Sequence, residues 1–243
     1  MRLCRVEGMD GRQVATFIGG AVLALTAAAC GGAASVAAPS PSATPAPTAI
    51  STASASGTVT ASALEWTVSD RSKATVRVRE QLASLNFPSD AVLVATGATG
   101  AFHLNSDGTF ASGSKISFRV DTLTSDSSQR DGFVKNSVLN TRQFPTATFV
   151  PAKATGLALP LPPSGSFTFT LGGKLTIHGV EKDVTFAVRA TRAGGDLTAT
   201  ATLDPTVKFG DFGMPLPASP GRVLSVVDEI KLVIDLVATG PKT

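Results

Sequence analysis

Residues 166–188, SFTFTLGGKLTIHGVEKDVTFAV, place an apolar side chain at almost every second position and then reverse direction. Successive side chains of a β-strand point to opposite faces, so this alternation predicts two long strands, each with one apolar and one polar face. Gly179 stands in the short connection, where a tight hairpin turn requires a positive φ. The pattern itself leaves open whether the apolar face belongs to a solid core or to the wall of a cavity.

The same period of two recurs in several other segments between residues 63 and 241. These segments are 72–80, 114–121, 197–204 and 229–238. Residues 91–104 and 166–178 are long for strands, which typically have about five or six residues, and both contain interior glycines that bend a strand. Such long strands favour a closed barrel over a sandwich, because closure removes exposed edges. We therefore predict an all-β domain over residues 63–241, an extended antiparallel barrel of about eight strands.

Residues 126–140 break this alternation. Their apolar side chains recur near helical spacing, and Asp126 or Ser127 is suited to cap the N-terminus of a helix. We expect a short helical segment there, ending before Pro145.

The N-terminal residues 1–29 are predicted to be an export signal. Arg2, Arg5 and Arg12 precede an apolar run that is too short for a membrane span and closes on small residues. The sequence LTAAAC followed by GG resembles a bacterial lipobox, which implies that Cys30 is lipidated and becomes the first residue of the processed protein. The alternative is a conventional signal with a fortuitous cysteine.

Residues 30–62 consist almost entirely of Ala, Ser, Thr, Pro and Gly and carry no charge. Such a segment has too little apolar surface to offset the entropy of ordering, so we expect a disordered tether. The domain that follows is then exported and lipid-anchored to the bacterial cell membrane, facing outside the cytoplasm.

The composition argues against several classes of function. The formal net charge is only +3, with no basic cluster or series of stacking aromatic residues, so nucleic acid is not an expected partner. Beyond Cys30 the chain has no cysteine and only His103 and His178, so we expect neither a disulfide nor a metal site. The S-x-x-K pattern at residues 112–115 lacks its companion motifs, and no G-x-S-x-G occurs, so we expect no enzyme and no cofactor.

Three segments together resemble one known family. Residues 173–184, GKLTIHGVEKDV, resemble the G-x-L-T-I-x-G-V-x-K-x-V signature of YceI-like proteins, and residues 130–149 and 209–214 are similar to two further motifs of that family. The likeness extends over roughly residues 64–237. It implies a lipocalin-like barrel, secreted or periplasmic, that holds a long polyisoprenoid chain in its lumen. The sequence departs from the family where Phe133 replaces a usual histidine and where no histidine ends the strand near residue 80.

The alternation also selects candidate residues for the lumen. Those expected to line it are Val76, Val78, Ile116, Phe118, Phe149, Phe167, Phe169, Leu175, Val184 and Phe186. Arg130 and Asp131 match the family motif and could lie at the barrel mouth, although a local ion pair or a helix cap would explain them as well.

We therefore expect non-enzymatic binding or carriage of a long isoprenoid-type lipid, such as a quinone or polyprenyl carrier, with membrane attachment through Cys30. The alternative is a solid-core module of the cell envelope that binds a protein partner through its outer surface.

Overall fold

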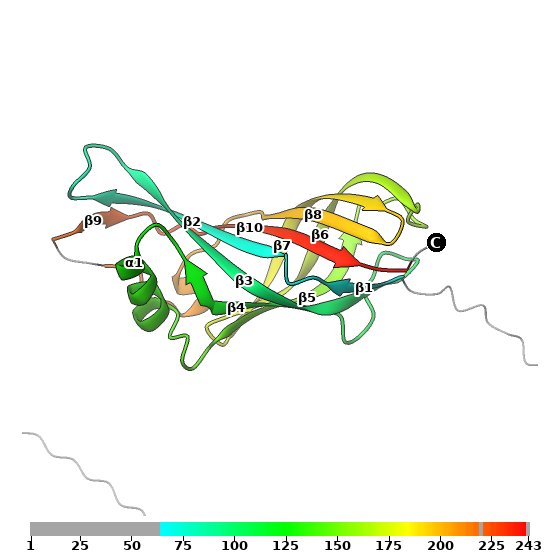
Figure 1. Ribbon diagram of the computed structural model, residues 1–243, viewed down its shortest axis with the longest axis horizontal. Helices are drawn as coiled ribbons and strands as arrows, with labels where there is room; N and C mark the ends of the chain where they lie inside the picture. Colours follow the sequence, from blue (N-terminus) through cyan, green and yellow to red (C-terminus); the bar gives the residue numbers. More distant parts are fainter. Residues whose placement is uncertain (1–63, 219–220, 242–243) are drawn as a thin grey trace, which may run out of the picture. The chain divides into compact units, whose positions relative to one another are not determined.

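The computed structural model describes residues 64–218 and 221–241 (Figure 1). The predicted export signal at residues 1–29, the lipidated Cys30 and the tether at residues 30–62 lie outside the described residues. None of the helices in the described part is both long enough and apolar enough to cross a membrane.

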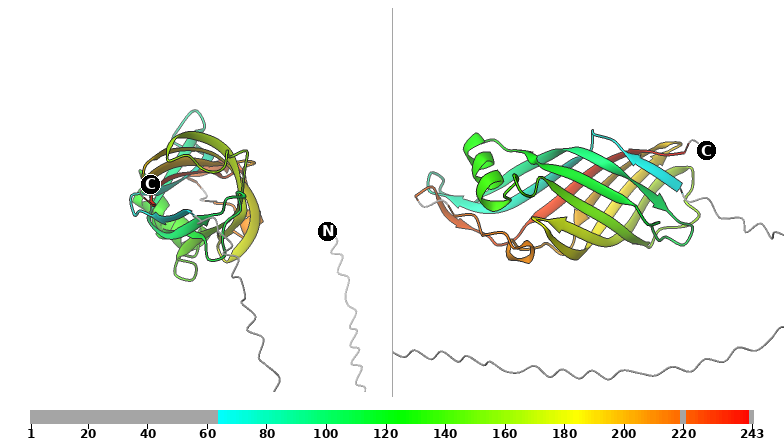
Figure 2. Two further views of the ribbon diagram at one scale, coloured as in Figure 1. Left: turned by 90° about the vertical axis from the view of Figure 1, so that its right-hand side faces the viewer. Right: turned by 90° about the horizontal axis from the view of Figure 1, so that it is seen from below.

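Ten strands of the described residues form one antiparallel sheet that closes into a barrel. They are β1 (Leu64–Val68), β2 (Lys73–Leu82), β3 (Ser89–Leu104), β4 (Lys115–Thr124), β5 (Thr146–Thr155), β6 (Ser164–Ile177), β7 (Val180–Ala193), β8 (Asp196–Leu203), β9 (Val223–Val226) and β10 (Lys231–Thr239). Eight of them form a ring in the order β10, β8, β7, β6, β5, β4, β3, β2, because β2 pairs again with β10. The end-on view in Figure 2 shows this ring. The predicted all-β antiparallel barrel is therefore confirmed.

The hairpin of β6 and β7 has the predicted geometry. The two strands pair in register from Ser164 and Ala193 to Ile177 and Val180, and His178 and Gly179 form the turn with φ values of 52° and 76°. Two positive φ values are typical of a two-residue hairpin loop. A Cβ atom at Gly179 would lie 2.7 Å from the ring of Phe144, so glycine is required there for space as well as for conformation.

The strands β1 and β2 are two segments of one strand position in the ring. Both pair with β3 and with β10, and a turn at residues 69–72 separates them. The interruption leaves Val237 of β10 without a strand partner on that side. The turn supplies the partners: the N–H of Ser69 donates to the carbonyl of Val237 at 2.8 Å, and Oγ of Ser72 donates to the same carbonyl at 3.1 Å and accepts from the N–H of Val237 at 2.9 Å.

A short helix lies beside one end of the barrel, within the predicted segment 126–140 (Figure 1). The α-helix α1 (Ser128–Phe133) continues into a π-helical turn, η1 (Val134–Val138). Ser127 caps α1, since its Oγ accepts from the N–H of Arg130 at 3.4 Å. A second short element, the 3₁₀ helix η2 (Gly210–Phe212), precedes β9.

Aromatic side chains and one arginine close the barrel end that contains β1. Trp66 stacks on Phe102 with ring centroids 6.4 Å apart, and Phe110 contacts Phe102 edge-on at 6.2 Å. The guanidinium of Arg192 lies 5.1 Å from the centroid of the Trp66 ring, and Arg192 donates to the carbonyl of Pro162 at 3.1 Å. The loop between β5 and β6 is thereby held across this end.

Replacing Ser72 by alanine tests whether its hydrogen bonds to Val237 stabilise the interrupted strand position. Ser72 has 0% exposed surface, so Ser72→Ala leaves the partly buried N–H of Val237 without its acceptor. We expect the free energy of unfolding to fall by about 1–3 kcal/mol, measured by denaturant titration. Ser112→Ala, at an exposed serine, is the matched control and should change it by less than about 0.5 kcal/mol. Equal effects of the two substitutions would contradict this role of Ser72.

Candidate functional site

The interior of the barrel is divided into two unequal spaces. The larger is a cavity of about 600 Å³ on the side of α1 and β9. The smaller space, of about 90 Å³, lies among the aromatic residues of the β1 end. Ile116, Phe149 and Ile234 line both spaces and therefore form the partition between them. Phe186 supports the partition, because its ring meets the ring of Phe149 edge-on at 5.1 Å.

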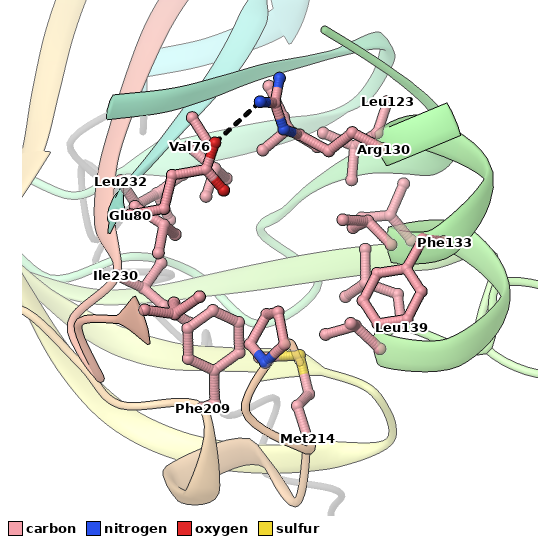
Figure 3. Close-up of a pocket in the computed structure, with 18 of the residues that line it drawn as sticks. Val76, Glu80, Leu123, Arg130, Phe133, Leu139, Phe209, Met214, Ile230 and Leu232 are labelled. Atoms are coloured by element: carbon pink, nitrogen blue, oxygen red, sulfur yellow. Dashed lines mark hydrogen bonds and ion pairs between the residues drawn. The ribbon is translucent and has the colours of Figure 1, made fainter. Parts of the chain in front are cut away.

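Apolar side chains from many elements form the wall of the larger cavity (Figure 3). Val76 and Val78 come from β2, Phe133 and Leu139 from the helical segment, and Met214 from the loop after η2. Small side chains such as Ala91, Ala95 and Ala147 leave the space open. A volume of this size is within the range of pockets that hold small molecules, about 300–1,000 Å³.

One ion pair stands in this apolar wall. The Nη2 atom of Arg130 in α1 lies 2.8 Å from Oε1 of Glu80 in β2, and the two side chains are only 19% and 9% exposed. Arg130 also pairs with the exposed Asp126. Figure 3 shows the Glu80–Arg130 pair on one side of the cavity, with Phe209 and Met214 opposite. A buried charge is costly without a partner, so the pair fixes α1 against β2.

Other polar side chains of the cavity gather near this pair. Ser84, Ser127, Gln129 and Arg222 come from the segments around α1, β2 and β9, and Arg222 donates to Oε1 of Gln129. One further polar residue of the cavity wall, Thr148, lies on β5 and belongs to none of these segments. The cavity therefore has a polar end beside α1 and an apolar end at the partition.

The structure distributes the candidate lumen residues over both spaces. The larger cavity is lined by Val76, Val78, Ile116, Phe118, Phe149 and Leu175. The smaller space is lined by Phe167, Phe169 and Phe186, together with Ile116 and Phe149. Val184 lines neither space and packs, partly buried, against the core.

The two candidate mouth residues have different positions. Arg130 lines the larger cavity, whereas Asp131 does not. The carboxylate of Asp131 accepts from the N–H of Ser125 at 2.8 Å and from its Oγ at 2.6 Å. Asp131 therefore orders the turn before the helix, which is neither the ion pair nor the helix cap that the sequence left open.

Several cavity residues were not among the candidates. Glu80 follows Val76 and Val78 at the same parity in β2, so the alternation did indicate that it faces inward. Phe209 and Met214 belong to residues 209–214, a segment selected by the family likeness, but nothing in their spacing indicated a cavity wall. Phe133, in place of the usual histidine, makes this part of the wall apolar.

The described residues do not present an arrangement suited to metal binding. No group of three or more His, Cys, Asp or Glu side chains among them is placed to hold a metal ion. The ring of His103 lies 3.8 Å from Glu65, and Nδ1 of His178 lies 3.3 Å from the carbonyl of Phe212. Neither histidine lines the larger cavity.

Comparison with known proteins identifies similar sequences and structures. The family model for the YceI-like domain matches residues 43–238. The "UPF0312 protein" of Azotobacter vinelandii is 28% identical over 142 residues, which are 56% of this chain and 68% of that protein. A polyisoprenoid binding domain from Saccharophagus degradans, implicated in plant cell wall breakdown, has a TM-score of 0.54 at 10% identity, over 73% of this chain and 99% of that one. A mutant Campylobacter jejuni YceI protein has a TM-score of 0.50 at 18% identity, over 67% and 91% of the two chains.

A double-mutant cycle tests the buried ion pair. Arg130→Met leaves the carboxylate of Glu80 in an apolar wall, and we expect it to lower the free energy of unfolding by about 3–5 kcal/mol. Adding Glu80→Leu removes that buried charge, so the double variant should be more stable than Arg130→Met alone.

Arg79→Met is the control for this cycle, measured by the same denaturant titration. Arg79 pairs with Asp90 at 3.0 Å on the outer face, with side chains 53% and 39% exposed. An exposed pair contributes only about 0–1 kcal/mol. A double variant that is no more stable than Arg130→Met would show that the carboxylate of Glu80 is not buried at a cost.

Proposed function

Because this chain belongs to the YceI-like family, we propose that its barrel binds and carries a long isoprenoid-type lipid, such as a quinone or a polyprenyl carrier. The observation that carries this proposal is the apolar cavity of about 600 Å³ inside the barrel. The likeness to a polyisoprenoid binding domain supports the same ligand class. The protein acts by binding rather than by catalysis.

The chemistry of the cavity wall favours a long chain over a short ligand. Moving one methylene group from water into an apolar environment gains about 0.8 kcal/mol, so about ten groups gain about 8 kcal/mol. Association itself costs an estimated 4–15 kcal/mol. A ligand with few carbon atoms would therefore bind weakly in this cavity, whereas an isoprenoid chain gains enough from burial alone.

The polar end of the cavity gives the ligand a direction. The apolar chain extends toward the partition at Phe149, and the head group remains near Arg130, Gln129 and Arg222. Arg130 is already engaged by Glu80 and Asp126, two carboxylates. Together with Arg222 these groups sum to no net charge, so the polar end favours an uncharged carbonyl or hydroxyl head group over a charged one.

We place this activity at the cell envelope. The composition of residues 1–62 supports export, acylation at Cys30 and a flexible connection to the membrane. A protein held in this way would take up and release lipid near its anchoring bilayer. The alternative, a solid interaction module, is disfavoured by the size of the cavity.

Native mass spectrometry after extraction in a mild detergent tests the ligand directly. We expect a stoichiometric apolar molecule with the mass of an isoprenoid compound. Repeated recovery of ligand-free protein, together with failure to take up an added polyprenol, would contradict the proposed function.

Filling the cavity tests where the ligand lies. Ala91 is buried and lines the cavity, so Ala91→Phe places a ring in the space that the chain would occupy. We expect the affinity for a polyprenol to fall on the order of tenfold or more. Ala187→Phe, at an exposed position of β7, is the matched control and should bind as the unsubstituted protein does. Circular dichroism verifies that both variants fold, and unchanged binding by folded Ala91→Phe protein would place the ligand elsewhere.

A further inference from the structure

Exposed large apolar side chains gather at one end of the barrel. Six such residues occur in the described part of the chain. Five of them, Leu85, Phe87, Leu216, Leu224 and Val227, belong to the β2–β3 connection, to the loop before β9, and to β9 with the residue that follows it. The sixth, Val150, lies on β5. We call the group of five the apolar rim.

The segments of the apolar rim lie side by side and project past the ring of strands. The N–H of Ala83 donates to the carbonyl of Arg222 at 2.9 Å, and β2 pairs with β9 up to Leu82 and Val223. Both the side view in Figure 1 and the view from below in Figure 2 show the β2–β3 hairpin and β9 extending beyond the barrel at the same end.

The same segments also form the opening of the cavity. Leu82, Ala83, Pro217, Val223 and Val226 line the cavity, whereas their neighbours Leu85, Leu216, Leu224 and Val227 face outward. These segments therefore present apolar side chains both to the cavity, beside the polar Ser84 and Arg222, and to the outside of this end. Phe87, at the hairpin, is 79% exposed, the highest value among the exposed large apolar residues.

The charge of these segments is low. Residues 81–89 contain no charged side chain, and residues 214–218 and 221–227 contain only Arg222. A surface that enters the boundary between lipid head groups and acyl chains needs this composition, because burying a charge there is costly. Arg222 can keep its guanidinium at the head-group level.

We propose that the apolar rim docks on a lipid bilayer and inserts Phe87 and Leu224 into it, so that the cavity opens toward the acyl chains. The proposal rests on the proposed function, because a lipid that is insoluble in water must enter the cavity from a lipid phase. Docking provides that route without exposing the chain to water. A bilayer accepts several protruding side chains without a complementary shape, whereas a protein partner would need a matching surface.

Site-specific fluorescence quenching tests insertion in the full chain. The single natural tryptophan, Trp66, is 1% exposed and packs at the β1 end, so it gives a constant background. In Phe87→Trp protein, vesicles of phosphatidylcholine brominated on the acyl chains should quench the added emission strongly. Val150→Trp is the control, because Val150 is also exposed, at 41%, but lies outside the apolar rim. Quenching of both variants alike, or of neither, would overturn the proposal.

Varying the lipid charge and the protein concentration distinguishes insertion of Phe87→Trp from electrostatic adsorption and from self-association. Since Arg222 is the one charged residue of residues 81–89, 214–218 and 221–227, which carry the apolar rim, quenching should change little when a quarter of the lipid is phosphatidylglycerol. A strong dependence on that anionic lipid would show electrostatic adsorption in place of insertion. A blue shift of the Phe87→Trp emission that depends on protein concentration without vesicles would assign the rim to a second copy of this chain instead.

Uptake kinetics connect docking to the ligand. In the double variant Phe87→Ser with Leu224→Ser, the initial rate of extraction of a fluorescent polyprenol from vesicles should fall on the order of tenfold. Its affinity for the same polyprenol presented in detergent should stay unchanged, and Val150→Ser should leave both quantities unchanged. An unchanged extraction rate in the double variant would refute the docking route. Insertion of Phe87→Trp by a protein that binds no polyprenol would refute the proposed function while leaving docking established.

Discussion

Closure of the sheet between β2 and β10 is the constraint on which the rest of the barrel depends. Lys73–Arg77 pair with Asp235–Lys231, so every strand of the ring has a partner on both sides. This pairing removes the inward side chains from water and satisfies the backbone groups that would otherwise form two open edges. The interruption between β1 and β2 removes strand hydrogen bonds along this edge of β10. The buried hydroxyl of Ser72 replaces them at Val237.

Side-chain size decides how each half of this closed barrel is filled. The alternation of apolar and polar residues is the same along the whole ring, yet the β1 end is packed with Trp66, Phe102 and Phe110, whereas the other end carries Ala91 and Ala95. Large aromatic rings occupy most of the space between the walls, whereas alanine and valine side chains leave it open. The lumen therefore keeps only about 90 Å³ of space in the half with β1 and about 600 Å³ in the other half.

The alternation in the sequence was sufficient to predict the barrel, the long strands, the turn at Gly179 and the short helix, because these features follow from local periodicity and turn chemistry. The alternation could not predict that Phe167 lines the smaller space and Leu175 the larger cavity. Both have the same parity in β6, but their distance along the axis decides which space they line, and that distance depends on strand tilt and register. The places of Phe133, Phe209 and Met214 over the cavity depend on how non-strand segments pack, which no period encodes. Glu80 was predictable by parity, although its charge made an inward position unexpected.

The partition formed by Ile116, Phe149 and Ile234 acts as a stop for anything that enters from the α1 end. The distance from the entrance to the partition therefore sets the length of a linear molecule that the larger cavity can hold. Smaller residues at the same positions would merge the two spaces and increase that length without altering the entrance. Under the proposed function, the partition limits the length of the bound chain and the polar end contacts its head group, so the two properties of the ligand depend on different residues.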